Sequence, residues 1–109
     1  MTWMTTLTLL VLAVLAPPAM GQFAALTDAN IKTAVRDWDS NPTIASNKYG
    51  PIDGWNTALV NNMANLFIAM AGFNADISRW NVASVRNMHS VFYGAKAFNS
   101  ELAGWNVAV

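Results

Sequence analysis

Residues 73–98 read FNADISRWNVASVRNMHSVFYGAKAF, and many of these residue types also occur 25 positions earlier in the chain. A tryptophan followed by an asparagine marks the period, at positions 55, 80 and 105. Other matching pairs are Val60 and Val85, Asn62 and Asn87, Met63 and Met88, Phe67 and Phe92, and Phe73 and Phe98. A fixed period of 20 to 50 residues is typical of stacked repeats. The sequence therefore predicts an extended repeat surface and not an enzyme pocket.

The pattern inside one repeat predicts a strand followed by a short helix. Residues 80–82 alternate between apolar and polar, as in a strand. The spacing of Val85, Met88 and Phe92 places all three on one helical face, and Gly94 follows as a stop. We therefore expect an α/β repeat, in which 25-residue strand–helix units wind into a coil. Residues 52–109 would contain two full copies and a truncated third.

A separate segment, residues 22–51, precedes the repeats. Thr27 is a suitable N-cap, and Ile31, Val35 and Trp38 share one helical face, so a helix is expected over Thr27–Trp38. Pro42 would end this helix, because proline disfavours helix at the residue before it. We interpret the helix as a cap over the open end of the stack, which repeat proteins need; the alternative is a binding element.

The first 21 residues are typical of a secretory signal peptide. Leu7–Ala16 is an apolar run of ten residues, too short for a membrane span of about 20. Small residues at Ala19 and Gly21 favour cleavage before Gln22. No Lys or Arg precedes the run, so an uncleaved apolar helix is the alternative. Cleavage would give a secreted or surface-exposed mature chain without a transmembrane span.

The repeated apolar positions are the candidate core, and the asparagine after each tryptophan is the candidate contact residue. If the tryptophan rings point inward, Asn56, Asn81 and Asn106 form the outer face of the strands. The alternative is that the three tryptophans face outward and form a row that binds carbohydrate. The candidate core consists of Trp55, Val60, Met63, Phe67, Phe73, Ile77, Trp80, Val85, Met88, Phe92, Phe98, Leu102 and Trp105.

The composition gives little support to catalysis or nucleic-acid binding. Six basic and six acidic residues cancel, and charged residues make up 11% of the chain, against about 25% in typical domains. No cysteine is present, so thiolate chemistry is excluded. His89 is the only histidine, and Asp76 and Glu101 favour turn chemistry over a catalytic carboxylate pair. We therefore expect no enzyme activity, no catalytic residues, no metal site and no cofactor.

The stretch FNADISRWNVASVRNMHSVFYGAKAFNSELAGWNV resembles the BspA-like repeat family of surface proteins, a branch of the leucine-rich-repeat type. The family pattern is similar to F-N-x-D-I-x-x-W-D/N-V-S-x-V-x-N-M-x-x-M-F-x-x-A-x-x-F-N, and the resemblance covers about residues 26–109. It implies a short leucine-rich-repeat-like solenoid with an N-terminal capping helix. Val85 departs from the general leucine-rich pattern, which has Asn or Cys there. The pairs Asn62 with Asn87, or Asn74 with Asn99, are candidates to hold the turns instead.

The resemblance implies a non-catalytic module that mediates adhesion or protein–protein binding at a cell surface. Its partner would be an unidentified extracellular protein or glycan. Two alternatives remain open. One is a carbohydrate-binding or hydrolytic wall protein that uses the tryptophan row and the acidic pair. The other is a truncated, non-functional repeat fragment, because repeat stacks normally need at least three copies for stability.

Overall fold

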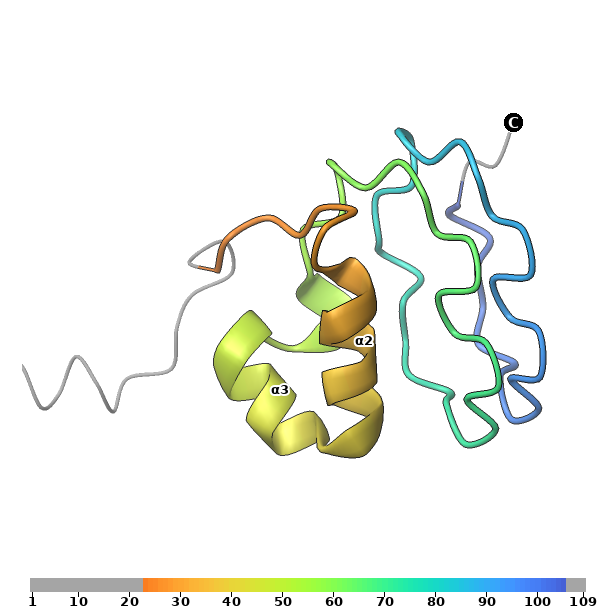
Figure 1. Cartoon of the computed structure of the whole chain (residues 1–109), viewed down its shortest axis with the longest axis horizontal. Coiled ribbons are helices and arrows are strands. Elements are labelled where there is room, and N and C mark those ends of the chain that lie inside the picture. Colours follow the sequence, from red (N-terminus) through yellow and green to blue (C-terminus); the bar gives the residue numbers. More distant parts are fainter. Residues whose placement is uncertain (1–22, 106–109) are drawn as a thin grey trace, which may run out of the picture.

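The computed structural model describes residues 23–105 (Figure 1). The proposed signal peptide, residues 1–21, and the candidate contact residue Asn106 lie outside the described residues. Within residues 23–105 the elements are α2 (Ile31–Ser40), α3 (Pro42–Tyr49) and the short 3-10 helix η1 (Ile52–Gly54). The repeats follow η1 as a coil of turns.

Helix α2 begins four residues later than the sequence suggested, at Ile31 instead of Thr27. Thr27 and Asp28 are used differently. The Thr27 hydroxyl accepts from Ala29 N at 3.2 Å, which forms a turn ahead of the helix. The Asp28 carboxylate reaches forward to the first repeat. The buried face of α2 consists of Ile31, Ala34 and Val35, at the spacing of one helical stripe.

Helix α3 was not predicted, because Pro42 was interpreted only as the end of the preceding helix. Pro42 instead stands in the first turn of α3, where the missing proline N–H would have no helical partner anyway. Asn41 has an extended backbone, and its side chain accepts from Ile44 N at 3.2 Å. The Tyr49 hydroxyl donates to Asp37 Oδ2 at 2.6 Å and ties α3 to α2.

The expected solenoid of strand–helix units is wrong. Within residues 55–105 the structure contains neither a strand nor a helix, and the only bridge is an isolated parallel one between Asn62 and Asn87. Residues 66, 68 and 70 donate to the carbonyls three positions earlier, which makes successive tight turns. Left-handed backbone at Asn65 (φ 60°) and Ala69 (φ 60°) prevents these turns from continuing as a helix. The apolar spacing of 3 and 4 therefore reflects tight turns, not helical periodicity.

The N–H groups of the residues that alternate with these donors explain the coil. They bond to the next repeat instead of to their own repeat. Met63, Asn65, Phe67 and Ala69 donate to the carbonyls of Asn87, His89, Val91 and Tyr93 at 2.7–2.9 Å. The donors are two residues apart, and so are the acceptors. The two coils consequently run side by side, as the green and blue traces show in Figure 1. We call this set of bonds the inter-repeat ladder.

The core is a column of aromatic rings along the stack. The Trp55 and Trp80 rings are stacked with centroids 5.8 Å apart, and Phe67 and Phe92 are stacked at 5.3 Å. Phe73 and Phe98 stack at 5.9 Å. Residues separated by 25 positions therefore occupy neighbouring layers.

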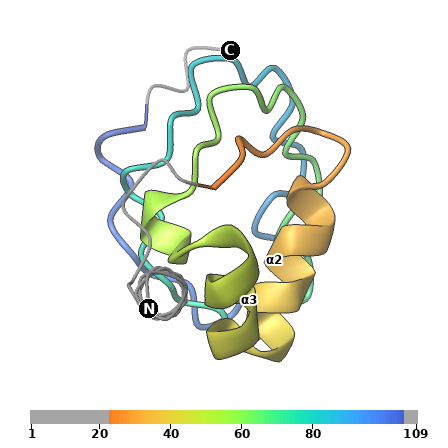
Figure 2. The ribbon, with the colours of Figure 1, turned by 90° about the vertical axis from the view of Figure 1, so that its left-hand side faces the viewer.

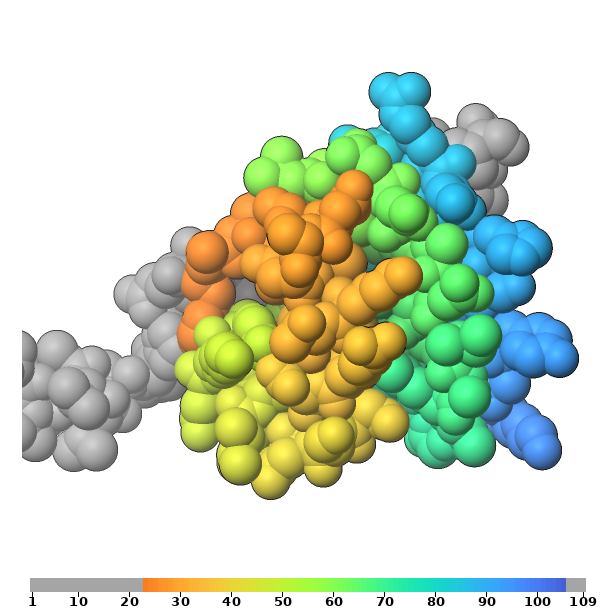
Figure 3. Space-filling view, viewed as in Figure 1, coloured from red at the N-terminus to blue at the C-terminus, as the bar shows by residue number. Residues whose placement is uncertain are grey.

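Helices α2 and α3 lie at the N-terminal end of this column, in front of the coils in Figure 2. Trp38 of α2 meets the Trp55 ring edge-on at 6.1 Å, and Tyr49 of α3 meets it at 5.7 Å. Leu26 N donates to Asn56 O at 2.9 Å, which fixes the segment before α2 to the first repeat. The space-filling view shows α2 directly against the coil of residues 60–70 (Figure 3).

Candidate functional site

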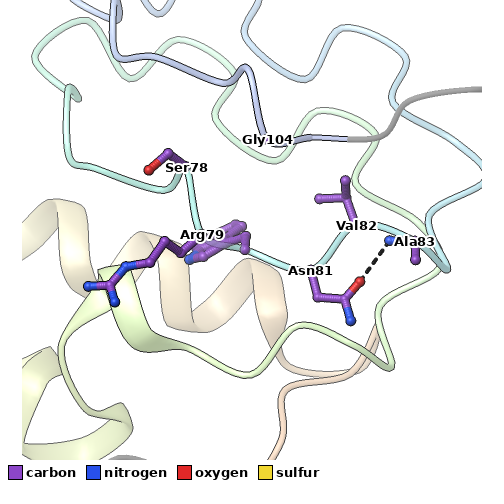
Figure 4. A pocket seen from close by; sticks show the side chains of 7 residues that line it. Ser78, Arg79, Asn81, Val82, Ala83 and Gly104 are labelled. Atoms are coloured by element: carbon purple, nitrogen blue, oxygen red, sulfur yellow. Dashed lines mark hydrogen bonds between the residues drawn. The ribbon is translucent and has the colours of Figure 1, made fainter.

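Asn56 and Asn81 lie exposed, each at the start of a turn in its repeat. The Oδ1 atom of Asn56 accepts from Ala58 N at 3.1 Å, and that of Asn81 accepts from Ala83 N at 3.0 Å. Figure 4 shows the second of these bonds. Asparagine thus mimics a backbone turn through its side-chain oxygen. Neither Nδ2 group has a hydrogen-bond partner within residues 23–105, so both amides can donate to a ligand.

The two asparagines belong to adjacent layers. The hydroxyl of Thr57, which is fully buried, donates to Asn81 O at 2.9 Å and joins the two segments directly. Equivalent positions of the two repeats are therefore presented next to each other.

An open hollow lies beside Asn81, lined by Ser78, Arg79, Trp80, Asn81, Val82, Ala83 and Gly104 (Figure 4). Arg79 Nη2 is 3.4 Å from Asp53 Oδ2, which links the second repeat to η1 across the surface. Both side chains are largely solvent-exposed, so this ion pair adds little stability. Figure 4 shows the Arg79 guanidinium extending away from Asn81, toward the side on which it meets Asp53.

The three tryptophans of the repeats occupy the interior and do not form an outer row. Trp55, Trp80 and Trp105 are 5%, 3% and 9% exposed. Their indole N–H groups donate to the carbonyls of Gly50, Ile52 and Ile77 at 2.7, 2.7 and 2.9 Å. Because the rings and their donors are used within the stack, a glycan site would have to use other side chains.

The remaining candidate core residues divide between the two repeats. Those of the first repeat and of the start of the second are buried: Val60, Met63, Phe67, Phe73, Ile77 and Val85. Those that end the stack are only partly buried: Met88, Phe92, Phe98 and Leu102.

The asparagine pairs that were candidates to hold the turns do so. Asn74 Nδ2 donates to Asn99 Oδ1 at 3.0 Å, and Asn99 N donates to Asn74 Oδ1 at 2.9 Å. Asn62 and Asn87 accept from the backbone N–H two residues later, at 2.9 Å each. The Asn74–Asn99 pair therefore joins the two repeats through side chains, whereas Asn62 and Asn87 each hold their own turn.

Of the acidic pair, Asp76 acts in a turn. Asp76 Oδ1 accepts from the Ser78 hydroxyl at 2.6 Å and from Ser78 N at 3.0 Å, and these bonds lower the pKa of the carboxyl. Glu101 and His89 are exposed. No cluster of three metal-ligating side chains occurs in the part of the chain that the structure describes.

Two features were missed by sequence reasoning. The Asp28 carboxylate accepts from Asn61 N at 2.8 Å and Asn62 N at 3.1 Å, and these two bonds lower its pKa. No sequence pattern connects residues so far apart. Ile68 and Tyr93 are 42% and 71% exposed and lie 25 positions apart, so the repeat alignment could have found this apolar pair.

Comparison with known proteins identifies the family. Residues 32–109 match the family described as "Mycoplasma protein of unknown function, DUF285". The chain belongs to this family. No curated protein and no solved structure matches it. The match begins inside α2 and includes both repeats, so α3 and the repeats fall within the family's shared region. No helix within residues 23–105 is long and apolar enough to cross a membrane.

Proposed function

We propose that this protein is a secreted or cell-surface repeat module that mediates adhesion by binding an extracellular protein, without catalysis. Support comes from the resemblance of residues 26–109 to BspA-like surface repeats and from the signal-peptide pattern of residues 1–21. Membership of a repeat-containing family is consistent with it.

The observation that carries the proposal is the placement of Asn56 and Asn81. Both side chains are exposed, both are held by a bond to their own turn, and both come from adjoining layers. Their orientation is fixed before a ligand arrives, which reduces the entropy lost on binding. Each contact is weak, and affinity grows when several equivalent contacts act together.

Substitution by aspartate tests these amides without breaking their turns. In Asn56→Asp and Asn81→Asp the carboxylate keeps the oxygen that accepts from the backbone, while the outward N–H₂ donor is replaced by a charge. We expect the double variant to lose at least about tenfold in binding of the immobilised protein to cultured eukaryotic cells, equivalent to about 1.4 kcal/mol. Unchanged binding would exclude this surface.

Asn87→Asp is the matched control. Asn87 is also exposed and also accepts from a backbone N–H two residues later, at 2.9 Å, but it belongs to the inter-repeat ladder segment. It should retain binding. Treating the cells with protease should abolish binding, whereas glycosidase treatment should not; the reverse result would support the carbohydrate-binding alternative.

A further inference from the structure

Ile68 and Tyr93 form an exposed apolar pair on the outer side of the coils. The two residues stand 25 positions apart, and they are 42% and 71% exposed. Ala69 N donates to Tyr93 O at 2.7 Å, so the pair comes from adjoining layers. Ile68 belongs to the first layer and remains exposed although the second repeat lies against that layer. The pair is therefore a feature of the lateral surface of the stack.

Basic and acidic side chains are separated along each repeat. Residues 80–97, the part of the second repeat that contains Tyr93, include Arg86, His89 and Lys96 and no acidic residue. The equivalent part of the first repeat, residues 55–72, has no charged residue. Acidic residues of the repeats occur only on the returning parts, at Asp76 and Glu101. The side of the coils that carries the apolar pair is therefore basic.

Helix α2 extends this basic character. Lys32 and Arg36 are exposed and four positions apart, so they share one flank of the helix. Asp37 lies on another flank, where it accepts from Tyr49 of α3. Figure 3 shows α2 directly against the coil of residues 60–70, and the helix and the two coils form one continuous surface in that view. We call the exposed basic and apolar side chains of this surface the basic-apolar face: Lys32, Arg36, Ile68, Arg86, Tyr93 and Lys96.

The four basic side chains of the basic-apolar face make no ion pair within residues 23–105. The other two basic residues of the chain do, since Lys48 lies 3.8 Å from Asp37 and Arg79 lies 3.4 Å from Asp53.

Two carboxylates adjoin the basic-apolar face without cancelling its charge. Asp28 accepts from Asn61 N and Asn62 N, and Asp39 is exposed near the end of α2. Four basic side chains against two acidic ones leave positive charge in excess.

We propose that the basic-apolar face binds an acidic segment of another protein, in which an aromatic or aliphatic side chain stands among the carboxylates. Complementary charge speeds the encounter and selects the partner. Tyrosine and arginine are the residue types enriched at protein interfaces. A sulfated glycan would match the charge but would bring no apolar side chain to pack on Ile68. This surface is distinct from Asn56 and Asn81, so the inference does not depend on the adhesion proposed above.

The probe is a fluorescein-labelled random copolymer of glutamate and tyrosine, titrated with the chain of residues 22–109 by fluorescence polarisation. We expect binding that weakens at least about tenfold when the ionic strength rises from about 0.01 M to about 0.1 M, because the screening length falls from about 30 Å to about 10 Å. Polyglutamate should bind at least about tenfold more weakly, since it has no ring to pack on the apolar pair. A copolymer of lysine and tyrosine should not bind.

Two double variants test the two components of the face. Ile68→Ser with Tyr93→Ser removes the apolar pair, and Arg86→Gln with Lys96→Gln removes two of the charges. Each double variant should weaken binding of the glutamate–tyrosine copolymer at least about tenfold. All four side chains are exposed, so the urea midpoints should stay close to that of the parent chain.

Matched controls remove the same kinds of side chain elsewhere. Ile44→Ser removes an apolar side chain of α3 that is 62% exposed. Lys48→Gln with Arg79→Gln lowers the net charge by the same amount as the basic double variant. Both controls should retain binding of the copolymer.

Absence of binding to the glutamate–tyrosine copolymer at low ionic strength would overturn the proposal. Equal loss of binding in the two charge-removing double variants would also overturn it, because the response would then follow net charge alone. Binding of polyglutamate or heparin as tight as that of the copolymer, with no effect of the apolar double variant, would show a general polyanion site instead. None of these results depends on the cell-binding assay.

Discussion

At the scale of single residues, the indole groups set the register between repeats. Trp80 Nε1 donates to Ile52 O and Trp105 Nε1 donates to Ile77 O, so each ring bonds to the carbonyl 28 positions earlier. A one-residue slip would break these bonds and leave each carbonyl with only the backbone N–H of Trp55 or Trp80 as its donor. The Trp-Asn pairs therefore mark the repeat in the sequence and also fix how one repeat sits on the other.

Comparison of Trp80→Phe with Trp80→Ala separates the contribution of the indole hydrogen bond to stability from the contribution of ring packing. We expect Trp80→Phe to lower the free energy of unfolding by about 0.5–1.5 kcal/mol, because Ile52 O loses the shorter of its two hydrogen bonds and keeps the one from Trp55 N at 3.3 Å. Trp80→Ala should cost about 3–5 kcal/mol through the additional loss of packing. Urea unfolding of both variants would measure this. Equal stability of Trp80→Phe and the parent chain would show that the bond contributes nothing.

Asp28 should make stability depend on pH. Its folded-state pKa lies below the ordinary 3.8, since the charged form accepts from Asn61 N and Asn62 N. The carboxylate therefore stabilises the fold at pH values above the unfolded-state pKa, and this stabilisation disappears as the pH falls through the folded-state pKa. Asp28→Asn should be less stable at pH 6, and the two urea midpoints should converge near pH 2. A constant difference across this range would contradict the assignment.

At the scale of elements, the sequence predicted the layers correctly but not their internal structure. The 25-residue period foretold that Trp55 would stack on Trp80, as observed. The strand–helix content was wrong because the spacing of Val85, Met88 and Phe92 is shared by helices and by consecutive tight turns. The positive φ values that distinguish the two fall on Asn65 and Ala69 in the first repeat and on Ser90 and Gly94 in the second. Only Gly94 is a glycine, and a single glycine is equally consistent with the end of a helix.

The candidate contact residues were only partly predictable. The repeat alignment located Asn56 and Asn81, since any residue after an inward tryptophan points outward. Their bonds to Ala58 N and Ala83 N could not be deduced, because they depend on local turn geometry. The Asp28 bonds were beyond sequence reasoning, as they join segments more than 30 positions apart.

Ala69 and Gly94 hold equivalent positions in the two repeats, and both have left-handed backbone. This equivalence allows a paired test. A Cβ on Gly94 (φ 76°) would approach Ala69 Cα at 3.1 Å and Ala69 N at 3.3 Å, so Gly94→Ala should destabilise the fold by about 1–3 kcal/mol. Ala69→Gly removes the steric cost of a Cβ in left-handed backbone and should be neutral or stabilising. Thermal unfolding compares the two. Equal melting temperatures for both variants would contradict the backbone geometry.

At the scale of the whole molecule, α2, α3 and the repeats form one packed unit. A single cluster of buried side chains extends from Ile31 in α2 through Trp55 to Trp105. Deleting residues 23–51 would expose the Trp55 ring and remove Asp28 from the first repeat. We expect the remaining chain to lose cooperative thermal unfolding by circular dichroism. A retained sharp transition would show that the repeats fold without the helices.

The central claim is that the second repeat accepts the ladder bonds of the first, while the equivalent N–H groups of Met88, Ser90, Phe92 and Gly94 have no acceptor within residues 23–105. Residue-resolved amide exchange of the chain of residues 22–109 tests it most directly. The account predicts slow exchange at Met63, Asn65, Phe67 and Ala69, whose N–H groups form the inter-repeat ladder. It predicts fast exchange at the N–H groups of Met88, Ser90, Phe92 and Gly94, which stand 25 positions later. Similar exchange rates in the two rows would contradict it.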